Sequence, residues 1–434
     1  MKIWPWLYLA LRLKRWLLLA LLGIILFGLG LAFALERHLS DFFDGIPSLW
    51  LIGIICIVCG VGLALLSFSR IGRLLLQSSA DEARGKVRNL YQRQYLRRGP
   101  RIVVIGGGTG LSVLLRGLKE YTSNLTAIVS VADDGGSSGR LRDQFGILPP
   151  GDLRNCLVAL ADTEPVMESL FNYRFHCGEG LEGHNLGNLL ITALTDLSGN
   201  METAINQISK VLAIRGRVLP ATLDNVVLAA ELSDGSTLKG ETVVSKTDKP
   251  INKAFLIPEN CSPLPEALEA LNEADAIILG PGSLYTSVIP NLLVPGIVEA
   301  IQKSTALKIY VCNVMTQYGE TRDYTAADHL QALYRHSAPD LVDYIVVNDQ
   351  DVPEPYRERY AAEGAVPVEI DRVRLQKMNV KIVAAPLIRQ GDYIRHDSQK
   401  LAGQIVNLIL GKRNSAPFNL VDHFIMWNKV TRNM

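Results

Sequence analysis

The chain lacks the cysteine spacings that mark a zinc site, although it contains six cysteines. Cys56 and Cys59 form a C-x-x-C pair, but they lie inside a long apolar run, so we interpret them as packing residues. The other four are scattered, which is typical of reduced cytoplasmic thiols. The sequence also lacks a serine-hydrolase elbow, an H-E-x-x-H pair and a kinase motif set, so it presents no nucleophile motif.

Net charge is also nearly absent, at +1 over 434 residues, but the charges are unevenly distributed. The first 101 residues hold 14 basic and 5 acidic residues, so the remainder is net negative. An acidic body argues against a nucleic-acid partner. The basic connector at 71–99 follows an apolar run, a position that favours contact with anionic lipid.

Two long apolar runs without charge occupy residues 16–35 and 49–69. Each reaches the roughly 20 residues that a membrane-spanning helix needs. A single run near the N-terminus is typical of a signal peptide, but the second run so soon after it predicts a transmembrane helical hairpin at about 1–70. Basic residues flank the outer ends of both runs, which places the N-terminus and everything after residue 70 in the cytoplasm.

From residue 100 to 434 apolar runs of strand length alternate with helical patterns, which predicts an α/β domain with a mostly parallel sheet. The pattern at 226–245, with an Asp234-Gly235 turn, predicts a β-hairpin insertion. The strand candidates are 101–105, 126–131, 275–279, 308–312, 343–347 and 380–384. The helix candidates are 111–120, 152–162, 186–197, 201–213, 264–273, 325–336 and 398–411.

Two glycine-rich turns follow the first two strand candidates. A strand, a bare-backbone turn and a helix start form an anion site, so two such turns predict a nucleotide-type ligand at the sheet edge. The first turn is neither a strict dinucleotide fingerprint, because Leu111 occupies the third glycine position, nor a P-loop. A tight turn without a ligand is the alternative. The turns hold Gly106, Gly107, Gly108, Thr109 and Gly110, and then Asp133, Asp134, Gly135, Gly136, Ser137 and Ser138.

Asp133 and Asp134 end the second strand, at the edge where ligands of open α/β sheets bind. One carboxylate could accept a hydrogen bond from a ribose hydroxyl, and the two together could hold Mg²⁺ against a diphosphate. They are therefore the candidate catalytic residues, and the candidate metal ligands if Mg²⁺ is used. The alternative is that one of them only caps the following turn.

Polar residues farther along the chain are candidates for the same site. Arg154 is a candidate phosphate contact, because a cation in the first turn of a helix opposes the helix dipole, whereas Asp152 is expected as its N-cap. His184 and Asn188 lie one helical turn apart and could face one pocket, although His184 could also be an ordinary loop residue. The remaining candidates are Asn185, the third glycine-rich turn with Gly280, Gly282, Ser283, Tyr285 and Thr286, and Asn313 after the next strand.

Six ordered motifs together resemble the gluconeogenesis factor family, a branch of the 2-phospho-L-lactate transferase (CofD-like) superfamily. The likeness covers about residues 100–412. The motifs are V-I-G-G-G-T-G from Val104, D-D-G-G-S-S-G-R-L-R from Asp133, P-P-G-D-L-R-N from Pro149, G-H-N-L-G-N from Gly183, G-P-G-S-L-Y-T-S from Gly280 and N-V-M-T-Q from Asn313.

The resemblance implies a Rossmann-like doubly wound fold and binding of UDP-sugars such as UDP-N-acetylglucosamine. It also implies a role in cell morphology and envelope synthesis during gluconeogenic growth. Arg395, in the R-H-D motif, would close the ligand cleft. Typical members are soluble, so the hairpin is a departure. We therefore expect a membrane-tethered regulator in the bacterial inner membrane, with its large domain cytoplasmic.

Three alternatives remain open at this point. The ligand could be a dinucleotide. The protein could be an Mg²⁺-dependent enzyme that transfers a phospholactyl-like group, or a structural membrane adaptor that binds no nucleotide. The sequence also leaves open whether the protein forms a homo-oligomer.

Overall fold

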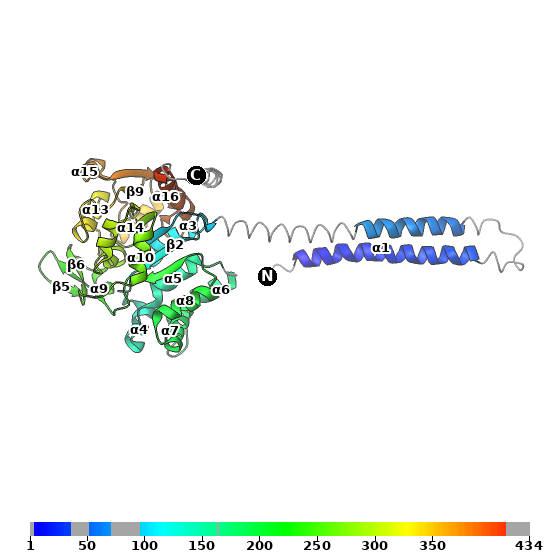
Figure 1. The fold of residues 1–434 in the computed structure, drawn as a ribbon, viewed down its shortest axis with the longest axis horizontal. Helices are drawn as coiled ribbons and strands as arrows, with labels where there is room; N and C mark the ends of the chain where they lie inside the picture. The colour runs from blue at the N-terminus through cyan, green and yellow to red at the C-terminus, as the bar shows by residue number, and fades with distance from the viewer. Residues whose placement is uncertain (1–3, 36–51, 71–95, 163–164, 414–434) are drawn as a thin grey trace, which may run out of the picture. The chain divides into compact units, whose positions relative to one another are not determined.

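The computed structural model describes residues 4–35, 52–70, 96–162 and 165–413. The chain divides into an N-terminal unit, Met1–Gln92, and a C-terminal unit, Arg93–Met434. Most of the predicted basic connector at 71–99 lies outside the described residues. Figure 1 shows the two helices of the first unit and the layered α/β arrangement of the second.

The N-terminal unit contains helix α1 (Trp4–Leu35) and a second helix, Ile52–Arg70. The two helices pack closely, because a Cβ atom on Gly60 would lie 2.6 Å from the backbone nitrogen of Phe27. At the other end of the contact, the Arg70 guanidinium lies 5.7 Å from the centre of the Trp16 ring. The helices therefore form an antiparallel hairpin.

One of these two helices, Ile52–Arg70, is long and apolar enough to cross a membrane, with 19 residues and a mean hydropathy of 2.5. The comparable apolar part of α1, Trp16–Ala32, is shorter. Many of their large side chains are exposed, including Leu18 and Leu65. The core helix of a soluble protein or a signal sequence can have the same length and hydropathy, so these two properties are weak evidence of a membrane span.

The C-terminal unit is built on a seven-stranded parallel sheet in the order β10-β9-β8-β7-β1-β2-β3. β1, β2 and β7 are buried along their whole length, as expected for strands covered on both faces. The strands are β1 (Ile102–Gly106), β2 (Leu125–Val129), β3 (Arg217–Pro220), β7 (Ala276–Leu279), β8 (Leu307–Val311), β9 (Tyr344–Asn348) and β10 (Lys381–Ala385). All six predicted strands are therefore confirmed.

The order of the strands reverses between the neighbouring strands β1 and β7. From β1 the chain continues to β2 and β3 on one side, whereas from β7 it continues to β8, β9 and β10 on the other. The carboxyl ends of β1 and β7 therefore lie at the reversal of strand order, the usual position of a ligand in such sheets.

Helices connect and cover the strands. α4, α7 and α8 gather at the end of the sheet that β3 occupies, and α15 lies at the β10 end (Figure 1). The helices are α3 (Gly108–Leu118), α4 (Gly136–Phe145), α5 (Pro150–Leu160), α6 (Pro165–Asn172), α7 (Leu186–Ser198), α8 (Met201–Val211), α10 (Pro265–Glu273), a π-helical turn at Leu284–Val288, α11 (Ile289–Leu292), α12 (Ile297–Lys303), α13 (Ala326–Arg335), α14 (Glu354–Ala362), α15 (Arg372–Lys377) and α16 (Ser398–Arg413).

Two small antiparallel sheets complete the unit. The insertion contains β4 (Val227–Leu232) and β5 (Thr237–Lys239), which form the predicted hairpin, together with β6 (Ile251–Ile257), in the order β5-β4-β6. Its short helix α9 (Glu241–Val244) follows β5. The other sheet pairs β11 (Ile388–Arg389) with β12 (Arg395–His396).

Candidate functional site

A cleft of about 470 Å³ opens at the carboxyl ends of β1, β7 and β8, where the sheet reverses. Its volume lies in the range of small-molecule sites. Its wall residues are Gly107, Gly108, Thr109, Gly110, Val113, Asp133, Asp152, Glu241, Pro281, Gly282, Ser283, Ser287, Asn313, Val314, Met315, Thr316, Gln317, Tyr360, Tyr393, Ile394, Arg395 and His396. The cleft thus brings together parts of all three glycine-rich turns, Asn313 and Arg395.

The first and third glycine-rich turns are in direct contact. A Cβ atom on Gly110 would lie 2.8 Å from the carbonyl oxygen of Pro281 and 3.0 Å from the Cα of Gly282. The start of α3 therefore fits against the third turn only because residue 110 has no side chain. Gly106, in contrast, is buried in β1 beneath the cleft and is not among the wall residues.

Asp152 lines the cleft, although its position in the sequence predicts only a helix cap. The expected N-cap role is wrong, since α5 begins at Pro150 after Pro149 and has no side-chain cap. The Asp152 carboxylate instead accepts a hydrogen bond from the Gly108 amide. Burial, and secondly the charge of Asp133, raise its pKa to about 7.

This contact changes what the first turn can bind. The Gly108 amide, one of the donors expected to hold a phosphate, already has a carboxylate partner in Asp152. An anionic ligand beside it is favoured when Asp152 is protonated or when a cation lies between the two.

The two aspartates of the second turn have different environments. Asp133 lines the cleft and accepts from the Gly135 amide at 2.9 Å, and burial raises the pKa of its carboxyl group. Asp134 accepts from the Thr242 amide at 2.9 Å and from its hydroxyl at 2.6 Å. Asp134 therefore fixes α9 of the insertion, and it is not among the wall residues of the cleft.

The fixed helix supplies a third carboxylate. Glu241, the first residue of α9, lines the cleft, and burial followed by the charge of Asp133 raises its pKa to about 9. Glu241 cannot be recognised from sequence as a site residue, because it follows an ordinary hairpin and belongs to no motif. In the described part of the chain no three His, Cys, Asp or Glu side chains stand close enough together to form a metal site. Mg²⁺ here would be held by Asp133, alone or with one further wall carboxylate, together with water and substrate phosphates.

The predicted site residues of α4, α5 and α7 form a buried network behind the second turn. The Ser137 hydroxyl lies 3.1 Å from Nδ1 of His184 and accepts from the Asn188 amide group at 3.2 Å. Arg154 donates to Oδ1 of Asn188 at 3.0 Å. Asn185 caps α7, where its side chain accepts from the Asn188 backbone. His184 and Asn188 thus share Ser137 as a hydrogen-bond partner, and neither belongs to the cleft wall.

Gly135, Gly136 and Ser138 of the second turn are not among the wall residues of the cleft. Gly135 and Ser138 both hydrogen-bond to Asp133, and Gly136 starts α4 with a positive φ of 48°. Their predicted contact with a ligand stays a prediction, because the cleft wall includes only Asp133 from this turn.

The third turn is anchored from behind by a buried carboxylate. Glu320 accepts from the amides of Tyr285 at 2.9 Å and Thr286 at 3.3 Å, and from the Thr286 hydroxyl at 2.8 Å. Burial raises the pKa of Glu320. Gly280 lies below the turn, at the end of β7, and its amide donates to the Ile105 carbonyl. Gly282 and Ser283 are the predicted residues of this turn that line the cleft.

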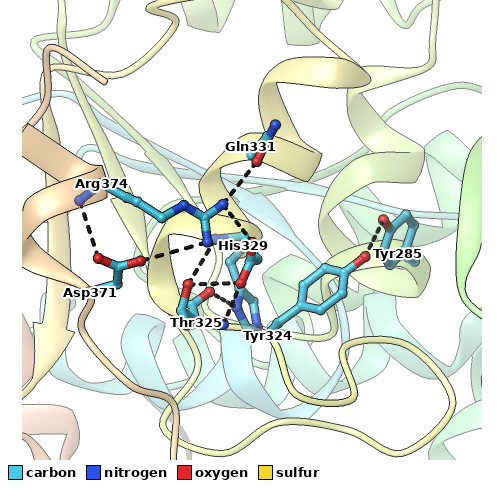
Figure 2. A network of polar contacts seen from close by, with 8 residues as sticks. Tyr285, Tyr324, Thr325, His329, Gln331, Asp371 and Arg374 are labelled. Carbon is cyan, nitrogen blue, oxygen red and sulfur yellow. Dashed lines mark hydrogen bonds and ion pairs between the residues drawn. The ribbon is translucent and has the colours of Figure 1, made fainter. Parts of the chain in front are cut away.

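Tyr285 connects the same turn to a polar network around the start of α13. Figure 2 shows its hydroxyl directed toward that of Tyr324, at 3.1 Å. Thr325 and Asp328 form a capping box next to it, and Arg374 pairs with Asp328 at 2.7 Å. Tyr285 and Thr286 therefore stabilise the turn, and in this structure neither forms part of the cleft wall.

The opposite wall is formed by the segment after β8 and by β12. Asn313 accepts from the Gly282 amide at 3.3 Å, and Gln317 donates to the Ser283 hydroxyl at 2.8 Å. Arg395 is exposed at the cleft. Beside it, the ring of His396 is buried and hydrogen-bonded to the Cys312 backbone. This burial lowers the pKa of the His396 imidazole to about 4.

Two aromatic side chains complete this wall. Tyr360 comes from α14 and Tyr393 precedes β12, with their ring centres 6.0 Å apart. Neither tyrosine is marked by the sequence, because each lies in a segment without a motif and reaches the cleft only through the packing of α14 against the β11–β12 sheet.

The chain matches known proteins over most of its length. The model of the family described as 2-phospho-L-lactate transferase CofD matches residues 102–388. The gluconeogenesis factor of Bacillus subtilis is 50% identical over 311 residues, which cover 71% of this chain and 98% of that protein. A crystal structure from Bacillus halodurans is similar, with a TM-score of 0.70 and 50% identity, and covers 71% of this chain and 100% of its own.

Other relatives of the same family name extend farther. A protein of Nostoc sp. is 47% identical over 414 residues, or 92% of this chain and 90% of its own. One of Clostridium acetobutylicum is 44% identical over 427 residues, or 95% and 93%. Both matches are longer than the C-terminal unit, so they include part of the N-terminal unit. Because the family model matches most of the chain and these relatives are 44–50% identical to it, the chain belongs to the CofD family, among the gluconeogenesis factors.

Proposed function

We propose that this protein binds a nucleotide-sugar of the UDP-sugar type and acts as a membrane-tethered regulator of envelope synthesis and cell shape during gluconeogenic growth. The observation that carries the proposal is the cleft itself, where the first and third glycine-rich turns meet Asp133, Asn313 and Arg395. The relatives named above are gluconeogenesis factors, which supports a role in carbon use.

The chemistry of the walls suits the two ends of such a ligand. Arg395 offers an exposed guanidinium for a diphosphate, while carboxylates such as Asp133 accept hydrogen bonds from ribose or sugar hydroxyls. Tyr360 and Tyr393 provide aromatic surface for a ring. No nucleophile or metal cluster is needed for binding alone.

A test of the ligand uses the full chain in detergent micelles and isothermal titration with UDP-N-acetylglucosamine. Gly108→Val places a side chain at a positive φ of 63° in the first turn and should abolish binding. Gly235→Val is the matched control, because it introduces the same strain at a φ of 82° in the remote β4–β5 turn. Saturable binding by the wild type and the control, with none by Gly108→Val, supports the proposal. Equal binding by all three proteins would contradict it.

The membrane tether is the second part of the proposal. It is supported by the apolar helix Ile52–Arg70, its close packing on α1 and the excess of basic residues on the predicted cytoplasmic side. The full chain should remain in the membrane after carbonate washing, and protease added to intact spheroplasts should spare the C-terminal unit. Digestion of that unit from outside would reverse the proposed orientation.

An Mg²⁺-dependent transferase is the second candidate function, favoured by the position of Asp133 on the cleft wall beside two further carboxylates. Mg²⁺ would neutralise phosphate charge there. Nucleotide release from an activated donor, lost on Asp133→Asn, would support an enzyme. UDP-sugar binding that needs no Mg²⁺ and leads to no release would support the regulator.

A further inference from the structure

A second hollow of about 300 Å³ lies next to the cleft and shares Val113, Tyr393, Arg395 and His396 with it. Its other walls come from α3, from the loop between β11 and β12, and from the start of α16. Three arginines line it: Arg116, Arg389 and Arg395. Asp392 is the one acidic residue among its wall residues in the described part of the chain.

The β11–β12 sheet places two of these cations against each other. Arg389 and Arg395 are direct cross-strand partners and both are exposed. Within the described residues, the guanidinium group of neither forms a hydrogen bond or an ion pair. Like charges at opposite positions destabilise a pair of strands, and this sheet has only two residues in each strand. The arrangement therefore stores repulsion that a bound anion would relieve.

The third cation and the loop add to the same hollow. Arg116 pairs with Glu168 at 3.3 Å, but both side chains are about half exposed, so the pair holds Arg116 only weakly. The loop is held from the other side by α14, because Tyr356 donates to the Gly391 carbonyl at 2.9 Å and Arg359 to the Asp392 carbonyl at 2.6 Å. The walls of the hollow are thus positioned before any ligand arrives.

We propose that this second hollow is an anion subsite that takes a phosphate or carboxylate group between Arg389, Arg116 and Arg395. The anion is either the far end of the ligand in the cleft, reaching past Arg395, or a separate small molecule. The subsite goes beyond the proposed function, because it binds an anion whether or not the cleft binds a UDP-sugar.

The test titrates inorganic phosphate into the full chain in detergent micelles. The wild type should bind saturably, and Arg389→Gln should bind about tenfold or more weakly, as expected for the loss of a charge-assisted hydrogen bond. Arg389→Lys should keep most of the affinity. Arg372→Gln, which removes an exposed arginine at the start of α15, is the matched control and should bind as the wild type does.

Stability separates the subsite from a structural role. Without phosphate, Arg389→Gln should melt at the same temperature as the wild type or higher, because it removes a like-charge pair. Phosphate should raise the melting temperature of the wild type and have little effect on Arg389→Gln. Unchanged phosphate affinity in Arg389→Gln, or no saturable binding by the wild type, would overturn the subsite.

A second titration, in saturating UDP-N-acetylglucosamine, identifies the source of the anion. Loss of phosphate binding means that the cleft ligand itself occupies the subsite, and unchanged phosphate binding means that a separate anion does. If UDP-N-acetylglucosamine fails to bind while phosphate still depends on Arg389, the nucleotide-sugar proposal fails and the subsite stands.

Discussion

Gly110→Ala tests directly whether the first and third glycine-rich turns form one site. The added methyl group would lie 2.8 Å from the carbonyl oxygen of Pro281 and 3.0 Å from both the nitrogen and the Cα of Gly282, whereas ordinary contacts begin at 3.4 Å. All three atoms belong to the backbone, so no side chain can rotate away. The third turn must therefore move by several tenths of an ångström.

The expected effect follows from that displacement. Overpacking of this kind costs about 1–3 kcal/mol of the free energy of unfolding. The third turn also carries Ser283 and the Asn313 contact, so its movement should weaken UDP-N-acetylglucosamine binding as well. Urea denaturation monitored by far-UV circular dichroism and isothermal titration measure the two effects on the same preparation.

Gly411→Ala is the control for this measurement. Gly411 lies in α16, and a Cβ atom there would have no neighbour within 4 Å. The change should stabilise the helix by about 0.5–1 kcal/mol and leave ligand affinity unchanged. If Gly110→Ala has the same free energy of unfolding and the same ligand affinity as the wild type, the two turns are not in contact and the proposed cleft is wrong.

Three further changes test the groups around the cleft. Because the pKa of Asp152 rises from 3.8 to about 7 on folding, the folded state binds more protons between these values, so the free energy of unfolding should fall as pH rises through this window. Asp152→Asn should flatten that dependence in urea titrations at several pH values, and an unaltered slope would exclude Asp152 as its source. Asp134→Ala should lower the free energy of unfolding by about 1–3 kcal/mol, because it leaves the Thr242 amide without its acceptor. Circular dichroism melts should show a larger loss for Asp134→Ala than for Asp133→Ala, and equal losses would contradict the structural role of Asp134. Glu320→Ala should destabilise the protein by at least about 2 kcal/mol and weaken ligand binding, since two buried amides of the third turn lose their acceptor; wild-type stability in a denaturation experiment would contradict the anchoring role.

The central strands could be predicted from sequence because each is a continuous apolar run between turn residues. β3 was not predicted, since Arg217–Pro220 has only four residues and ends in proline, features that an edge strand tolerates. The insertion was recognised from its Asp234-Gly235 turn, but β6 follows after α9 and pairs with β4 on its other side. That pairing is set by tertiary packing and leaves no local pattern.

The site was predictable where glycine is required by geometry. Gly107, Gly108 and Gly110 line the cleft as expected, because a close backbone approach can be read from glycine itself. Polar residues were harder to place. Asp133 and Asp134 are adjacent and alike in sequence, yet one reaches the cleft and the other fixes the insertion. Their tertiary partners distinguish them, since Thr242 binds Asp134 whereas Gly135 and Ser138 bind Asp133.

Glu320 has a consequence for the thermodynamics of ligand capture. Its three hydrogen bonds hold the third turn in one conformation before anything binds, so a ligand there loses little free energy to ordering of the loop. Affinity at this wall should then depend mainly on the match between ligand and rigid backbone, and analogues that differ by one misplaced group should be discriminated sharply. A loosely tethered loop would adapt to each of them instead.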